Sequence, residues 1–142
     1  MTRSLILVAA ARVLMPLLLL YALFLLWRGH NAPGGGFVGG LVAASAFVLY
    51  SLTAGVAASR RALWIDPSTL LSLGLAVALA AGIPGLLAGG GFMTAVWGEL
   101  HLGASHLALG TPLLFDVGVF LAVLGVVLTI VFTLAEATLT ED

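Results

Sequence analysis

The stretch from Gly29 to Gly40, GHNAPGGGFVGG, lies between two long apolar segments and is the starting point for predicting the fold. It is too rich in glycine and proline for an ordinary helix, because both residues destabilise helix interiors. Irregular backbone at membrane depth persists only where other protein covers it or a water-filled cavity solvates it. The stretch therefore predicts a buried contact or a hydrated pocket, and a chain that works with partners.

The composition is that of a membrane protein. Of 142 residues, 62% are hydrophobic and 8% are charged, whereas a soluble domain carries roughly 25% charged residues. The net charge of −1 gives no reason to expect a nucleic-acid partner. The chain has no cysteine, which excludes disulfides and cysteine-ligated metal centres as intrinsic features.

Four apolar segments approach the length of about 20 residues that an α-helix needs to cross a bilayer. They cover residues 5–27, 37–58, 69–88 and 113–135. We therefore expect an all-α, polytopic membrane protein whose single domain, residues 1–142, contains four transmembrane helices. The third connection, Gly89 to Gly110, is the longest. Trp97 beside polar residues predicts an interfacial segment there, such as a short helix lying on the outer surface.

Local signals refine these helices. Pro67 is expected in the first turn of the third helix, with Asp66 or Ser68 as its cap. Pro16 and Pro84 predict bends in their helices. Each bend is either a kink that only affects packing or a break in a helix that lines an ion path. Small residues at four-residue spacing predict close helix contacts. These rows are Gly74, Ala78 and Gly82; Gly36 and Gly40; and Gly118 and Ala122.

The arginines predict the orientation in the membrane. Alternating helices place Arg3, Arg12, Arg60 and Arg61 on one side and Arg28 on the other. The positive-inside rule then places both termini in the cytoplasm. Arg12 lies inside the first helix, where we expect it either to extend toward the interface or to pair with Glu136.

Asp116 is the leading candidate for a functional carboxylate, because a charged group at membrane depth usually has a partner or a purpose. It lies about one turn into the last helix. One interpretation is a carboxylate facing a hydrated pocket that exchanges protons or cations. The alternative is an acid that favours the positive end of the helix dipole and reaches water.

Other titratable residues share the predicted outer side with Asp116. Histidine titrates near neutral pH, so this group could hold or relay protons; the alternative is a set of interfacial polar residues. The ion-path candidates are Asp116, His30, Glu99, His101 and His106. Their spacing matches no strong metal motif, so we expect no metal. No catalytic triad, elbow or phosphate loop is present, so we expect neither an enzyme nor a cofactor.

Two motifs, GHNAPGGGFVGGLV at Gly29 to Val42 and GTPLLFDVGVFLAVLGVV at Gly110 to Val127, resemble the MnhB family, the B subunits of the Mrp-type multisubunit Na+/H+ antiporters. The resemblance covers nearly the whole chain. The family's motif falls on a set of residues that, apart from the ion-path candidates His30 and Asp116, we expect to pack helices or subunits. They are Gly29, His30, Asn31, Pro33, Gly34, Gly35, Gly36, Phe37, Gly39 and Gly40, with Phe115, Asp116 and Gly118 in the second motif.

The resemblance implies a small subunit in the cytoplasmic (inner) membrane of a bacterium or archaeon. Its implied partners are the other antiporter subunits, membrane lipids, and Na+ and H+ as transported ions. The antiporter-like subunits of this superfamily move protons on buried lysines and glutamates. This chain has no lysine, and Asp116 is its one acid expected inside a span. We therefore expect it to complete an ion path at a subunit interface without being the main pump.

Three hypotheses remain open on the sequence. In the first, Asp116 and His30 contact the ion on the outer side. In the second, the chain is a purely structural module whose Gly36 docks neighbouring helices. In the third, the same module serves a membrane-bound hydrogenase-type, complex I-related pump. An independent channel or exporter is a fourth option.

Overall fold

The computed structural model describes residues 4–29, 35–92, 97–102 and 105–140, and of residues 97–109 the backbone only. Four of its helical stretches are long and apolar enough to cross a membrane: Leu5–Arg28, Gly35–Ala54, Val56–Leu87 and Thr111–Thr140. The predicted all-α, polytopic fold is confirmed for these membrane-spanning stretches. The elements in chain order are α1 (Leu5–Arg28), α2 (Gly35–Ala54), α3 (Val56–Leu63), α4 (Pro67–Ala80), α5 (Ile83–Leu87), β1 (Trp97–Leu102), β2 (Ser105–Gly110) and α6 (Thr111–Thr140).

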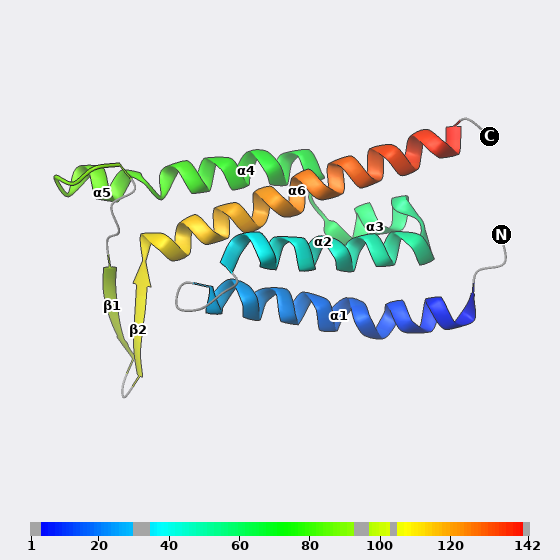
Figure 1. Cartoon of the computed structure of the whole chain (residues 1–142), viewed down its shortest axis with the longest axis horizontal. Helices are drawn as coiled ribbons and strands as arrows, with labels where there is room; N and C mark the ends of the chain where they lie inside the picture. Colours follow the sequence, from blue (N-terminus) through cyan, green and yellow to red (C-terminus); the bar gives the residue numbers. More distant parts are fainter. Residues whose placement is uncertain (1–3, 30–34, 93–96, 103–104, 141–142) are drawn as a thin grey trace.

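The long helices form a row in which α1 packs on α2, α2 on α6 and α6 on α4 (Figure 1). The start of α1, the end of α6 and all of α3 lie at one end of this row, which we call the termini end (Figure 1). The hairpin of β1 and β2 lies with α5 at the opposite end, which we call the hairpin end (Figure 1). The core runs between the helices. Its residues are Ala22, Ala43, Ala44, Phe47, Leu70, Leu124, Leu128 and Phe132.

The third connection differs from the prediction. The expected interfacial helix is wrong, because Trp97–Leu102 and Ser105–Gly110 pair as an antiparallel hairpin that brings Trp97 opposite Gly110. The third span is also divided, since α4 ends at Ala80 and α5 begins at Ile83. Pro84 explains the break, because it has no N–H to donate to the carbonyl of Ala80.

The second connection contains a helix of its own. Gly55 has φ 91°, a conformation that favours glycine, and it separates α2 from α3. α3 turns back along α2, where the buried Ser59 hydroxyl donates to the carbonyl of Phe47 at 2.9 Å. Pro67 then occupies the first turn of α4, and Asp66 stands at the N-cap without a side-chain capping bond.

Candidate functional site

The two sequence motifs meet at the hairpin end, where the start of α2 contacts the second turn of α6. A Cβ atom at Gly35 would lie 3.4 Å from Asp116 Oδ1 and 3.6 Å from Oδ2. One at Gly36 would lie 2.0 Å from the carbonyl oxygen of Asp116, closer than any side chain allows. The glycines therefore let α2 approach the backbone and the carboxylate of Asp116 directly.

The glycine-rich motif is helical from Gly35 onward. The expectation of irregular backbone is thus wrong for residues 35 and 36, which precede the helix expected from residue 37, while residues 30–34 lie outside the described chain. Helix forms there because tertiary packing outweighs the low helix propensity of glycine. Gly36 and Gly40 face α6, where a Cβ at Gly40 would lie 2.9 Å from the carbonyl oxygen of Phe120, and Gly39 faces Ala22 of α1.

Other small residues line the contact between α4 and α6. A Cβ at Gly74 would lie 2.3 Å from the nitrogen of Ala122, and one at Gly118 would lie 2.5 Å from the nitrogen of Ala78. At these distances only the hydrogen atom of a glycine fits, so the backbones of α4 and α6 are in direct contact. Gly82, from the same sequence row, lies at the break between α4 and α5.

Asp116 is half-buried. Within the described residues, no hydrogen bond or salt bridge reaches its carboxylate. It lies beside Gly35, the first residue of α2, and near the start of its own helix at Thr111. The N-termini of both helices carry partial positive charge, which favours a carboxylate without requiring an arginine. The carboxylate is therefore not bound to a fixed cation in the part of the molecule that the structure describes.

For the other ion-path candidates, the structure describes the backbone or nothing. His30 lies outside the described residues, as do Asn31, Pro33 and Gly34. Backbone register pairs His101 with His106 and Glu99 with Ala108 in the hairpin. They lie on the strands next to α6, at the same end of the bundle as Asp116 (Figure 1). Among the residues that can be described, no three His, Asp or Glu side chains gather as metal ligands.

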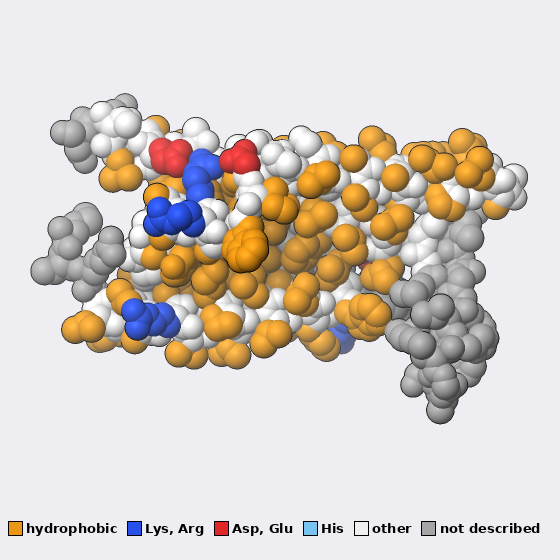
Figure 2. Space-filling model, turned by 180° about the vertical axis from the view of Figure 1, so that it is seen from behind, with side chains coloured by type: hydrophobic (Ala, Val, Ile, Leu, Met, Phe, Trp, Pro, Cys, Tyr) orange, Lys and Arg blue, Asp and Glu red, His pale blue; other side chains and the backbone are white. Residues whose placement is uncertain are grey.

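The structure pairs Glu136 with Arg60, a contact that the sequence did not predict. Arg60 Nε and Nη2 donate to the two oxygens of Glu136 at 2.9 and 3.2 Å, and Nη1 donates to Asp66 at 3.1 Å. The guanidinium also lies 5.3 Å from the ring centroid of Phe132. The proposed pairing of Arg12 with Glu136 is therefore wrong, because Arg60 occupies both oxygens. Figure 2 shows acidic and basic side chains grouped at one end of a largely hydrophobic face.

The match to a family model decides the relationship. The model described as "Domain related to MnhB subunit of Na+/H+ antiporter" matches residues 6–129. The chain belongs to the MnhB family. The resemblance seen in the two motifs is thus confirmed.

Relatives of this MnhB-family chain are found in several bacteria. It is 37% identical over 138 residues to the B subunit of the Na(+)/H(+) antiporter of Bacillus subtilis, covering 95% of both chains. It is also 37% identical to the B subunit of the Na(+)/H(+) antiporter of Alkalihalophilus pseudofirmus, over 88% of each chain. A probable A/B subunit of a K(+)/H(+) antiporter of Rhizobium meliloti is 35% identical over 88% of this chain, which corresponds to 13% of that protein.

A solved structure shares the fold. It is the Mrp complex from Dietzia sp. DQ12-45-1b, to which the MnhB-family chain is similar with a TM-score of 0.77 and 37% sequence identity. The similarity covers 92% of this chain and 14% of the matched chain. The arrangement of helices described above is therefore found within a much longer polypeptide of that complex.

Proposed function

We propose that this chain is a B-type subunit of a multisubunit antiporter that exchanges Na+ for H+ across a bacterial or archaeal cytoplasmic membrane. Two relatives at 37% identity are named as B subunits of Na(+)/H(+) antiporters. Its role is in transport, with no covalent chemistry. The arginines support an orientation in which the termini end, with Arg60 and Arg61 on α3, faces the cytoplasm.

We further propose that an A-type subunit packs against it. The Rhizobium meliloti relative, whose name combines the A and B subunits, contains the matching segment within a much longer chain. The matched chain of the Dietzia complex is also far longer than this one. Domains joined in one polypeptide in some organisms are good candidates for contact where they are separate chains.

The observation that carries the functional assignment is the Asp116 carboxylate held against Gly35. It lies where both family motifs converge, and no arginine in the described chain neutralises it. A carboxylate without a fixed ion-pair partner can accept a proton or bind a mobile cation. We propose that it contributes to an ion path at the hairpin end, completed by neighbouring subunits.

The test is Asp116→Asn in the assembled complex, with Glu136→Gln as a matched control at the other end. Na+-dependent proton movement is followed with a pH-sensitive dye in everted membrane vesicles, and assembly is followed on blue-native gels. We expect Asp116→Asn to lose most antiport with assembly intact, while Glu136→Gln retains it. Normal antiport by Asp116→Asn would refute the ion-path role.

The structural alternative, in which Gly36 docks neighbouring helices, needs a test at another residue of the motif. Gly36 packs on α6 of its own chain, so Gly36→Leu disturbs this chain before any partner. Phe37 belongs to the same motif, but its side chain is 58% exposed. Phe37→Ala should leave the chain folded and weaken assembly if the motif also binds a neighbouring protein of the complex. An unchanged complex on native gels would argue against that docking role.

A further inference from the structure

Arg12 is a cation within a transmembrane helix that has no acidic partner among the described residues. Both salt bridges found there belong to Arg60. Arg12 is exposed and lies seven residues after the start of α1, about 10 Å along the helix axis. A charge inside a membrane-spanning helix is costly, so an arginine there normally finds a counter-charge.

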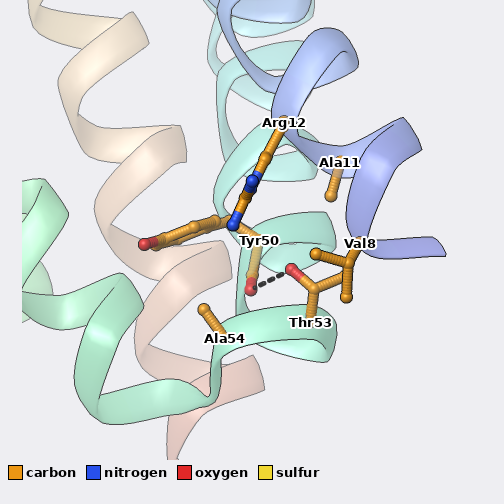
Figure 3. A pocket seen from close by; sticks show the side chains of 6 residues that line it. All are labelled: Val8, Ala11, Arg12, Tyr50, Thr53 and Ala54. Atoms are coloured by element: carbon orange, nitrogen blue, oxygen red, sulfur yellow. Dashed lines mark hydrogen bonds between the residues drawn. The ribbon is translucent and has the colours of Figure 1, made fainter. Parts of the chain in front are cut away.

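A pocket of about 180 Å³ lies beside Arg12, between α1 and the last turn of α2. Figure 3 shows the Arg12 side chain extending from α1 toward Tyr50 of α2. The other lining residues are Val8, Ala11, Thr53 and Ala54. The Thr53 hydroxyl already donates to the carbonyl of Tyr50 at 3.0 Å, so the guanidinium is the charged donor that remains for a ligand in the pocket. At about 30 Å³ per water molecule, the space is large enough for a phosphate group.

We propose that this pocket binds the phosphate of an anionic phospholipid, held by Arg12. Guanidinium groups bind phosphate oxygens in a bidentate manner. Basic pockets between transmembrane helices on the cytoplasmic side are typical sites for anionic lipid headgroups. The pocket lies at the level of the last turn of α2, the end of the bundle to which the proposed orientation assigns the cytoplasmic leaflet.

The surroundings favour a lipid over the carboxylate of another protein in the complex. α1 is the least buried of the four long helices. On the side of α1 that carries Arg12, Leu5 before it and Leu23 after it are more than half exposed, at 85% and 56%. This apolar surface extends along the helix on both sides of Arg12 and suits acyl chains whose phosphate is at Arg12.

The experiment compares Arg12→Gln with Arg61→Gln, an exposed arginine of α3 that forms no salt bridge in the described chain. Each variant is purified in mild detergent with the subunits that remain bound, and retained phosphatidylglycerol is quantified by mass spectrometry. We expect Arg12→Gln to retain about tenfold less phosphatidylglycerol, in line with the loss of a charge-assisted hydrogen bond. Arg61→Gln should retain the wild-type amount.

Equal phosphatidylglycerol in Arg12→Gln and the wild type would overturn the proposal. Loss of a partner protein with unchanged lipid content would also overturn it, in favour of a protein carboxylate. If Arg12→Gln does not accumulate, the wild-type protein is examined in phosphatidylcholine nanodiscs with and without phosphatidylglycerol. A higher melting temperature with phosphatidylglycerol supports the site, and an unchanged one overturns it.

Discussion

The acidic side chains at the two ends of the bundle have different partners. At the termini end, Asp66 and Glu136 both bind Arg60, which also stacks on the buried ring of Phe132. At the hairpin end, Asp116 lies against Gly35 with no ion pair in the described chain. The comparison separates acids whose ion pairs connect helices from an acid that packed helices position without an ion pair in the described chain, as the proposed ion-path role requires.

The packing that positions these acids also differs between the ends. Glycine rows bring α2 and α4 into backbone contact with α6, so Asp116 is positioned by closely packed helices. The termini end depends more on polar contacts of α3, including the Ser59 bond to Phe47 and the Arg60 contacts. We therefore expect substitutions at the hairpin end to have larger effects on stability.

The largest effect is expected for Gly36→Leu. Its side chain would collide with the backbone of Asp116, and overpacking of this kind costs about 1–3 kcal/mol or more. The matched control is Ser45→Leu on the exposed face of the same helix. Melting temperature and expression level in membranes should fall sharply for Gly36→Leu only. Equal behaviour of the two variants would mean that close contact of α2 and α6 does not position Asp116.

A smaller effect is expected for Ser59→Ala, which removes the hydrogen bond that ties α3 to α2. The serine is fully buried, and a lost hydrogen bond of this kind costs about 1 kcal/mol. The melting temperature in detergent should fall modestly, while Ser72→Ala, on the exposed surface of α4, should not change it. A fall as large as that of Gly36→Leu would contradict the proposed ranking of the two ends.

The smallest effect is expected for Arg60→Gln. Its ion pairs are partly exposed, with side-chain exposures of 33% for Arg60, 57% for Asp66 and 48% for Glu136. Such pairs typically contribute about 0–1 kcal/mol, and salt screens them. The melting temperature should fall slightly relative to Arg61→Gln, and the difference should shrink in high salt. A salt-independent loss would assign the stabilisation to the contact with Phe132 instead.

The sequence predicted the helices well because long apolar runs are a strong signal. It missed the hairpin, although residues 97–102 and 105–110 contain leucines that alternate with other residues, the period of a strand. α3 was hidden because the second connection was interpreted as a loop between spans. The contact of Arg60 with Glu136 joins residues 76 positions apart, and no local pattern specifies which arginine faces an acid on another helix.

The candidate site was predicted in part. Asp116 and the glycine-rich motif were both singled out, but their contact depends on how α2 and α6 are rotated about their axes. Periodicity alone does not fix that rotation when a helix is apolar on all sides. The sequence therefore singled out these residues, while the structure shows that Gly35 and Asp116 are in contact.

The central claim is that Asp116 is reached by water and ions from the hairpin end. The chain has no cysteine, so Asp116→Cys and Glu136→Cys can each be labelled on an otherwise unreactive chain with a membrane-impermeant thiol reagent. In intact cells of the assembled complex, we expect Asp116→Cys to react from outside and Glu136→Cys to react only in everted vesicles. An Asp116→Cys that is unreactive from outside, with the complex intact, would contradict the account.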